Sequence, residues 1–527
     1  MGNKIVILDS TLRDGAQGVG ISFSVEDKLH IAELLDAVGI QYIEAGNPAS
    51  NPKELEFFER LKSIKLRQAK ITAFGSTRRK NTLPEDDIGL QTLLAVDTPV
   101  CTVFGKSWKL HIEKVLETTT EENLSMIYDS CKYLKGKGKE VIYDAEHFFD
   151  GYKDNPSYAK KTLEAAISGG ADRICLCDTN GGTFPETVKT VVSDIKESFS
   201  VPVGVHFHDD CGLATANSIT AVLAGASEIQ GTFLGFGERC GNANLSEIIA
   251  NLQLKLNFKC IKKEQMSMLT QTAKSVAALA NISLNGSMPY VGKNAFAHKA
   301  GMHADGVLKV RKSFEHIKPD LVGNIRRFPT SEISGRTVII EKIKQMLPGT
   351  DISAEKVKKI LSNIKELEKA GYQFEEADAS FERIVRKIVG FDKPFFKTLY
   401  YHIDTNFYND TEKTTDARAV VKIQVEDKIQ LMAAEGNGPV HALDQALRKA
   451  LEVFYPILAK VKLTDYKVRV LDSKNATASR VRVLITSLVG EHTFTTVGVS
   501  EDVVAASWKA LEDSVEYLLI KQKYSVG

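Results

Sequence analysis

The 527-residue sequence predicts an α/β fold: a TIM (β/α)8 barrel, then a helical connector and a C-terminal α+β regulatory module with an internal duplication. Short β-rich runs alternate with longer amphipathic runs over about the first 260 residues, as in parallel strands joined by helices. Polar residues collect after several of these runs. Near the C-terminus the pattern changes to paired strands and a helix, and this pattern then occurs a second time.

Eight short runs, each followed by a helix-like stretch, are the strands of the expected barrel. Eight β/α units in about 260 residues is the count and size of a TIM barrel, whose active site lies at the carboxyl ends of the strands. A doubly wound sheet also alternates, but it would not place candidate site residues after so many separate strands. The expected strands are IVILD (5–9), YIEA (42–45), ITAF (71–74), VCTVF (100–104), VIYDA (141–145), RICLC (173–177), VGVHF (203–207) and EIQGTF (228–233).

Two further parts are expected after the barrel, which we place at residues 1–262. Residues 263–392 show helical periodicity around a Gly- and His-rich segment, which predicts a helical connector. Residues 393–527 predict a regulatory domain of two similar halves, each made of strands and a helix. Duplicated modules often bind small effectors and pair across a two-fold axis, so we expect a homodimer.

Glycines mark the expected turns of this last domain. Gly436 and Gly438 precede the first predicted helix, VHALDQALRKALEVFY, and Gly498 precedes the second, DVVAASWKALEDSVEYLLIK. We therefore expect all three glycines to lie in turns.

Composition and charge exclude several classes of protein. The chain carries 68 Lys and Arg against 67 Asp and Glu, so no net field favours nucleic acid or a membrane as a partner. The N-terminus lacks the apolar stretch of a signal peptide, which favours a cytoplasmic location. The seven cysteines show no C-x-x-C spacing, which fits a reducing compartment. Cys175 and Cys177 alternate in an apolar run and are expected in the core.

Two histidines at the end of the seventh expected strand, His206 and His208, predict a metal site. The period of two along a strand turns both imidazoles to one face and Phe207 to the other. Such pairs are often structural, but at the carboxyl end of a barrel strand they point into the functional mouth. Asp14 supplies a hard oxygen, and this mixed set suits Mg²⁺, Mn²⁺ or Zn²⁺. The nearby alternatives are Asp9, Asp209 and Asp210.

Five motifs, DSTLRDGAQ, IEAGNP, CDTNGG, HFHDDCGLATANS and GERCGNAN, occur in this order. Together with AEGNGPVHALDQAL near the C-terminus, they resemble the metal-dependent acyl-CoA condensing barrels that include isopropylmalate, homocitrate and citramalate synthases. The resemblance spans almost the whole chain, and ordered motifs are more specific than any single one. It implies a Claisen-type condensation of acetyl-CoA, the co-substrate, with a 2-oxo acid, followed by thioester hydrolysis.

The resemblance implies roles for the residues around the metal. The metal ligands of the family match Asp14, His206 and His208, and Asn242 matches a position that contacts the metal or orients its ligands. Arg13 matches a catalytic, substrate-binding arginine beside the oxyanion that develops on the ketone oxygen.

It also implies further catalytic and substrate-binding positions. Thr179 matches a contact to the substrate carboxylate, Glu44 and Glu146 match acidic active-site positions, and His303 matches a histidine contributed after the barrel. The acetyl methyl group must lose a proton from carbon, so a positioned base is needed. Glu146 and His303 are both candidates for this base.

The segments YDAEHFFDGYKDNP (143–156) and VGNIRRFPTSEISGR (322–336) look most like the citramalate branch, which implies pyruvate as substrate and isoleucine as effector. No tyrosine matches the one that the isopropylmalate branch carries after the connector histidine. Pyruvate presents only a methyl group, so we expect apolar fillers; Phe74 and Phe104 are candidates, unless both are barrel core. The alternatives are a synthase for another 2-oxo acid, a retro-aldol acyl-CoA lyase, and a non-catalytic sensor.

Overall fold

The computed structural model describes residues 4–299, 301–329, 336–347, 349–350, 352–390, 393–407, 415–471, 479–490 and 492–524. The chain forms two compact units. The first consists of Met1–Phe296 and His316–Arg326, and the second of Ala297–Glu315 and Arg327–Gly527. Residues 330–335, within the segment VGNIRRFPTSEISGR, lie outside the described residues.

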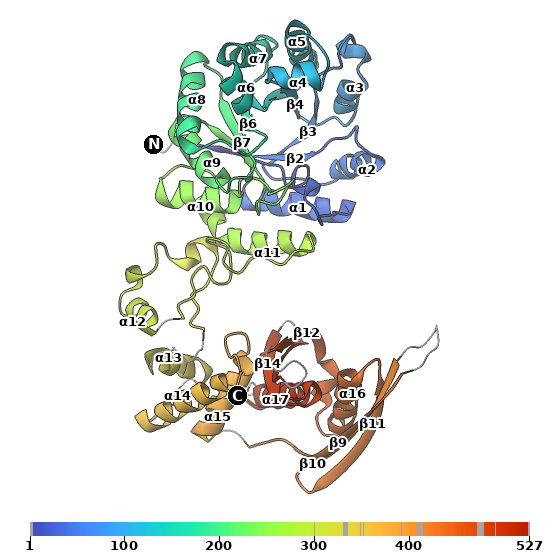
Figure 1. Ribbon diagram of the computed structural model, residues 1–527, viewed down its shortest axis with the longest axis vertical. Helices are drawn as coiled ribbons and strands as arrows, with labels where there is room; N and C mark the ends of the chain where they lie inside the picture. Colours follow the sequence, from blue (N-terminus) through green and yellow to red (C-terminus); the bar gives the residue numbers. More distant parts are fainter. Residues whose placement is uncertain are drawn as a thin grey trace. The chain divides into compact units, whose positions relative to one another are not determined.

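The first unit contains a closed barrel of eight parallel strands in the order β1 to β8, with β1 paired to β8 (Figure 1). The predicted TIM barrel is therefore confirmed, since every strand overlaps its predicted run. The strands are β1 (Val6–Asp9), β2 (Tyr42–Gly46), β3 (Lys70–Ser76), β4 (Val100–Lys106), β5 (Glu140–Glu146), β6 (Arg173–Asp178), β7 (Val203–Phe207) and β8 (Glu228–Gly231).

Helices surround this barrel (Figure 1). Local signals set their ends: the Ser24 hydroxyl accepts a hydrogen bond from Asp27 N at the start of α1, and Gly39, with φ of 104°, ends it. The helices are α1 (Val25–Val38), α2 (Pro52–Leu61), α3 (Ile88–Ala95), α4 (Lys109–Lys114), α5 (Thr120–Gly136), α6 (Phe148–Asp154), α7 (Pro156–Ser168), α8 (Pro185–Ser198), α9 (Ala214–Leu223), α10 (Leu245–Lys255) and α11 (Leu269–Leu279), with short 3₁₀ helices η1 (Gly15–Gln17), η2 (Pro84–Asp86), η3 (Lys263–Met268) and η5 (Pro319–Val322).

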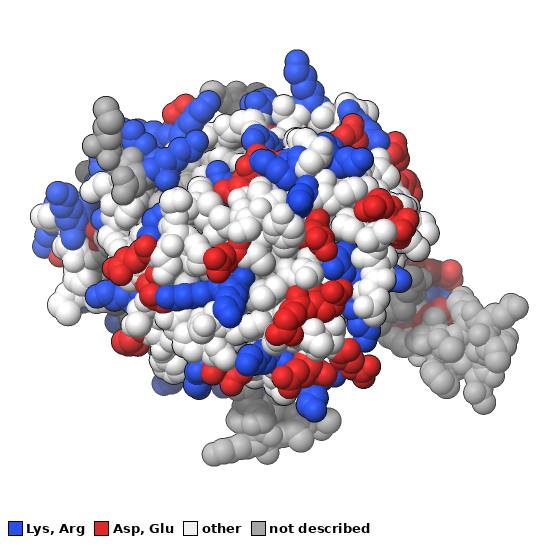
Figure 2. Space-filling model, turned by 90° about the horizontal axis from the view of Figure 1, so that it is seen from above, with Lys and Arg blue, Asp and Glu red and all other residues white. Residues whose placement is uncertain are grey.

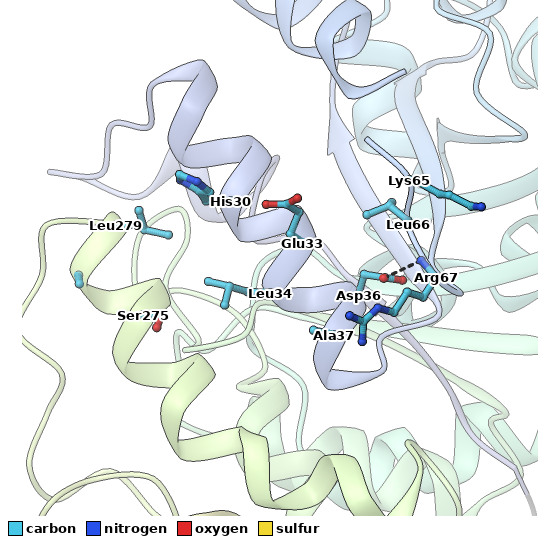
Figure 3. A pocket seen from close by; sticks show the side chains of 11 residues that line it. His30, Glu33, Leu34, Asp36, Ala37, Lys65, Leu66, Arg67, Ser275 and Leu279 are labelled. Carbon is cyan, nitrogen blue, oxygen red and sulfur yellow. Dashed lines mark hydrogen bonds between the residues drawn. The ribbon is translucent and has the colours of Figure 1, made fainter. Parts of the chain in front are cut away.

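Helix α11 lies beside α1 in the first unit. Figure 3 shows a groove between the two helices, with Leu34 and Ala37 of α1 and Leu279 of α11 among its apolar lining residues. The packing of α11 therefore extends the apolar core of the barrel unit beyond α10.

The inside of the barrel changes from apolar to polar along the strands. Leu8, Tyr42, Val100 and Ile142 form one buried apolar layer. Two residues further along each of these strands, the inward positions carry polar side chains, all of them buried: Ser10, Glu44, Thr102 and Asp144. Because every second side chain of a strand points to the same face, these polar side chains also point into the barrel. They form the next layer toward the carboxyl ends of the strands.

Connector helices begin the second unit. Buried side chains of α13, α14 and α15, such as Ile343, Ile360 and Phe381, pack together with Val497 and Val499 of the C-terminal module. This apolar cluster joins the connector to the module within one unit. The helices are α12 (Gly301–Lys309), η4 (Arg311–Ser313), α13 (Arg336–Met346), α14 (Ala354–Lys369) and α15 (Asp378–Val389).

Two similar halves make up the rest of this unit, which confirms the predicted duplication. Each half is an antiparallel three-stranded sheet followed by a helix, with sheet orders β11-β10-β9 and β12-β13-β14. Among the described residues no helix is both long and apolar enough to cross a membrane. The elements are β9 (Lys397–Phe407), β10 (Thr415–Val425), β11 (Lys428–Gly436), α16 (Pro439–Glu452), η6 (Pro456–Lys460), β12 (Lys462–Val470), β13 (Val481–Val489), β14 (His492–Ser500) and α17 (Val503–Tyr524).

Two of the three expected turn glycines lie in strands. Gly436 is the last residue of β11, paired with Ala417 of β10, and Gly498 is inside β14, so the prediction of both as turn residues was wrong. A Cβ atom at Gly498 would lie 1.9 Å from the carbonyl oxygen of Ala506 in α17, and one at Gly436 would lie 2.5 Å from the backbone nitrogen of Ala442 in α16. Both glycines therefore allow a helix backbone to approach a strand closely, and they do so in both halves of the duplication.

Charged side chains of both signs share the face shown in Figure 2, where Lys and Arg lie interspersed with Asp and Glu. This arrangement matches the near-neutral formal net charge of +1.

Candidate functional site

A cavity of about 220 Å³ lies at the carboxyl ends of the barrel strands. Its apolar lining includes Phe74 and Phe104. Six of the polar residues predicted for the site also line it, namely Arg13, Asp14, Glu146, Thr179, His206 and His208. The structure thus brings together side chains that lie near the carboxyl ends of strands β3, β4, β5 and β7 or follow strands β1, β6 and β7.

Three buried side chains converge as a candidate metal site. Asp14 Oδ2 lies 3.4 Å from His206 Nε2 and 3.7 Å from His208 Nε2. The ligand atoms of all three lie within 4.8 Å of one another. Asn242 lies beside them, because it forms a β-bridge with His208 and its Nδ2 donates to Asp14 Oδ1 at 3.1 Å.

The protonation states of two of these groups favour metal binding. Burial alone would raise the pKa of Asp14, but Arg13 and the two histidines hold it well below its ordinary value. Burial, together with the neighbouring His206, lowers the pKa of His208 to about 4. An ionised carboxylate and a neutral imidazole both offer lone pairs, so the set fits Mg²⁺, Mn²⁺ or Zn²⁺.

The three alternative ligands are engaged in local structure. Asp9 Oδ1 accepts a hydrogen bond from Thr11 N at 2.8 Å, and Asp209 Oδ1 accepts one from Ala214 N at 2.8 Å. Asp210 pairs with Arg239 at 2.8 Å. Asp14 is therefore the carboxylate that the fold directs at the two histidines.

Arg13 is held by two carboxylates and an aromatic ring. Its Nε donates to Glu44 Oε2 at 2.6 Å, its Nη1 lies 3.2 Å from Asp14 Oδ2, and its guanidinium carbon lies 3.9 Å from the centroid of the Phe74 ring. Burial alone would lower the pKa of Arg13, but Glu44 and Asp14 raise it above its ordinary value. The cavity therefore contains a fixed positive charge.

Glu44 was predicted to bind substrate, but it is fully buried and is absent from the cavity lining. The Ser10 hydroxyl and Arg13 Nε both donate to its Oε2, each at 2.6 Å. Because Arg13 lines the cavity and donates to Glu44, Glu44 is placed to orient Arg13.

Phe74 and Phe104 lie at the mouth and belong to none of the buried core clusters. Their rings stack with centroids 5.2 Å apart and an interplanar angle of 15°. One wall of the cavity is therefore apolar.

Glu146 and Thr179 complete the polar lining. Glu146 forms an ion pair with Lys106 of the neighbouring strand. Thr179 Oγ1 accepts a hydrogen bond from the backbone nitrogen of His147 at 2.9 Å. Glu146 is the last residue of β5 and Thr179 directly follows β6, so both side chains lie at the carboxyl ends of the strands and line the cavity.

Sequence reasoning missed Asp144, which also lines the cavity. Gln230 Nε2 donates to its Oδ1 at 2.9 Å, and burial together with Glu44 raises its pKa to about 7. The period of two, applied from Glu146, would have found it. Cys177, expected in the core, is buried as predicted but lines the cavity as well.

His303 belongs to the second unit, in α12. Its ring stacks on Phe314 with centroids 4.3 Å apart, and its side chain is exposed. The structure does not place His303 among the residues that line the cavity of the barrel.

Family models cover nearly the whole chain. The HMGL-like model matches residues 4–276, the homocitrate synthase post-HMGL domain-like model matches residues 290–372, and the model of the LeuA allosteric (dimerisation) domain matches residues 375–519.

Curated relatives match along their full length. An (R)-citramalate synthase from Aquifex aeolicus is 50% identical over 524 residues, covering 99% of both chains. One from Geobacter sulfurreducens is 49% identical over the same length, again covering 99% of both. A 2-isopropylmalate synthase from Methanocaldococcus jannaschii is 32% identical over 527 residues, covering 99% of this chain and 96% of that one. The chain therefore belongs to the HMGL-like family of barrel enzymes, in the branch that holds the (R)-citramalate synthases.

Proposed function

We propose that this chain is an acyltransferase that condenses acetyl-CoA with pyruvate and releases citramalate and CoA. A carbon–carbon bond forms between the acetyl methyl carbon and the ketone carbon of pyruvate. The methyl proton passes to a base, the ketone oxygen gains a proton, and water cleaves the thioester. The observation that carries the proposal is the buried set of Asp14, His206 and His208 beside the fixed charge of Arg13.

Asp14, His206 and His208 would hold a divalent ion, with Asn242 beside Asp14. When bound, the ion supplies Lewis-acid polarisation of the ketone of a chelated 2-oxo acid. Arg13 is positively charged in advance of the reaction, so it stabilises negative charge that develops on the ketone oxygen without reorganising.

Other residues of the chain orient the substrate and move the proton. The Thr179 hydroxyl donates to the carboxylate of the 2-oxo acid. Glu146 lines the cavity and His303 lies in α12, and one of them takes the methyl proton while the other assists thioester hydrolysis.

The stacked rings in the cavity favour a small 2-oxo acid. A cavity of about 220 Å³ with stacked rings on one side fits the single methyl group of pyruvate against Phe74 and Phe104. The relative named 2-isopropylmalate synthase makes a bulkier 2-oxo acid the second candidate. A retro-aldol acyl-CoA lyase on the same metal is a third, and the match to a LeuA allosteric domain argues against it.

Release of free CoA from acetyl-CoA tests the substrate. We expect the highest kcat/KM with pyruvate in a panel that includes 2-oxobutyrate, 2-oxoisovalerate and 2-oxoglutarate. A higher value with 2-oxoisovalerate or 2-oxoglutarate would identify another synthase. Cleavage of a hydroxyacyl-CoA without net condensation would favour the lyase.

We propose that the C-terminal module makes the chain a homodimer. The match to a LeuA allosteric (dimerisation) domain supports this, as do Ile429 and Leu431 of β11, which are 57% and 55% exposed. The chain has a mass of 58.0 kDa, and light scattering should give twice that value. A monomer at micromolar concentration would contradict the proposal.

We also propose isoleucine as an inhibitory effector of this module, because isoleucine would be the end product of a route through citramalate. Isoleucine should lower CoA release in the full chain, with leucine as the matched control. Equal effects of the two amino acids, or none, would contradict this choice.

A further inference from the structure

The turn between β5 and α6 contains a strained residue next to the cavity. His147 adopts the left-handed conformation, with φ of 54° and ψ of 36°, and it is only 7% exposed. A non-glycine residue in this region costs free energy, which the surrounding contacts must offset. The contacts of His147 therefore indicate what the strain maintains.

The backbone of His147 contacts a cavity residue directly. Its N–H donates to Thr179 Oγ1 at 2.9 Å, and Thr179 lines the cavity. A threonine hydroxyl has a single proton to donate. Because Thr179 Oγ1 already accepts from His147, the lone pair on that side is used and the hydroxyl proton is free to point to another acceptor.

The side chain of His147 bonds Asp150 of α6, which in turn contacts the loop of Thr179. Its Nδ1–H donates to Asp150 Oδ2 at 3.1 Å, and Asn180 Nδ2 donates to the same oxygen at 3.0 Å. Asn180 directly follows Thr179. The segment after β5 is thus bonded to two consecutive residues after β6: the backbone of His147 bonds Thr179, and the carboxylate of Asp150, which the imidazole holds, bonds Asn180.

Ring packing fixes the imidazole in this position. Its centroid lies 4.2 Å from that of His111 and 5.8 Å from that of Trp108. His147 is also the N-cap residue of α6, yet its side chain makes no capping hydrogen bond there. The imidazole instead pairs with the carboxylate of Asp150 in the first turn of α6.

We propose that His147 is a positioning residue that directs the Thr179 hydroxyl toward the carboxylate of the bound 2-oxo acid. The inference rests on the proposed function for the identity of that ligand. His147 acts through Thr179 and is not itself among the residues that line the cavity.

A double-mutant cycle on the full chain tests this role. His147→Val disfavours the left-handed backbone, and Thr179→Val removes the hydroxyl. We expect His147→Val to raise the KM for pyruvate about tenfold, as for a lost oriented hydrogen bond, with the KM for acetyl-CoA changed less than about twofold. In the Thr179→Val background the same change should add less than about twofold.

Two further variants control for strain and folding. Asn257 is exposed and also left-handed, with φ of 59°, so Asn257→Val adds similar strain away from the cavity and should leave both KM values unchanged. His147→Gly keeps the backbone conformation and the N–H but removes the imidazole link. It should fold like the wild type and raise the KM for pyruvate about threefold.

Independent effects of His147→Val and Thr179→Val would overturn the inference, as would an unchanged KM for pyruvate in His147→Val or an equal rise in both KM values. The proposed function fails separately, if the wild type prefers another 2-oxo acid. The cycle then uses that acid, since each carries the same carboxylate, and its outcome decides the inference in the same way.

Discussion

Asn242 Nδ2 donates a hydrogen bond of 3.1 Å to Asp14 Oδ1, although the two residues lie 228 positions apart in the chain. Closure of the barrel brings the loop after β8 next to the loop after β1. The bond turns the other oxygen of Asp14, Oδ2, toward His206 and His208. Asn242 therefore orients the carboxylate that we expect to bind the metal.

Asn242→Ala should weaken metal binding about 10- to 100-fold, because Asp14 loses the group that orients it. Equilibrium dialysis with Mn²⁺ measures this. Asn244→Ala is the matched control, since Asn244 contacts Glu247 instead of Asp14. Unchanged affinity in Asn242→Ala would show that Asp14 needs no such support.

Glu44→Gln should lower kcat about 100-fold with little change in the KM for pyruvate, because Arg13 loses the charged partner that directs it at the developing oxyanion. Steady-state kinetics with pyruvate checks this. Ser10→Ala removes only the hydrogen bond of a neutral donor to Glu44, and it should lower kcat much less than Glu44→Gln does. If Glu44→Gln instead raised KM with kcat unchanged, Glu44 would contact the substrate after all.

Phe104→Ala should broaden the substrate range, because it opens one side of the stacked pair with Phe74. We expect the ratio of kcat/KM for 2-oxobutyrate to that for pyruvate to rise about tenfold, the usual effect of room for one methylene group. The same ratio in Phe149→Leu, a change in the core behind β7, serves as control. An unchanged ratio in Phe104→Ala would show that the Phe104 ring does not determine which 2-oxo acid is preferred.

Glu228 at the start of β8 gives a prediction about pH. It is fully buried, 3.3 Å from Arg173, and burial raises its pKa from 4.5 to about 7. A carboxyl with a raised pKa in the folded chain stabilises the fold below its unfolded pKa, and this contribution is lost as the pH rises through 7. Glu228→Gln removes that dependence. The Tm of the variant minus that of the wild type should therefore rise between about pH 5 and about pH 8. A Tm difference that does not change with pH would contradict the raised pKa of Glu228.

Much of the fold followed from local patterns. All eight barrel strands were predictable because buried parallel strands are short apolar runs separated by helical periods. The place of Gly498 inside a strand was not predictable, because a glycine is needed there for the close approach of α17, which is a separate element. A glycine that makes room for a helix looks in sequence like a glycine in a turn.

The site was predictable where one strand sets the geometry and less so where several meet. His206 and His208 share a face of β7, so the period of two is sufficient to predict their convergence. The place of Glu44 behind Arg13 depends on how β1 and β2 pair, and the left-handed turn at His147 depends on contacts to the loop after β6. The spacing of residues within one segment does not predict such contacts between strands.

Formation of labelled citramalate from ¹³C-pyruvate and acetyl-CoA, followed by NMR with the metal-loaded protein, tests the central claim most directly. We predict one citramalate and one free CoA per pyruvate consumed in the wild type. His206→Ala should fold normally, bind the metal poorly and form no citramalate above background. Citramalate formation by His206→Ala at the wild-type rate, or its absence in the wild type, would contradict the account.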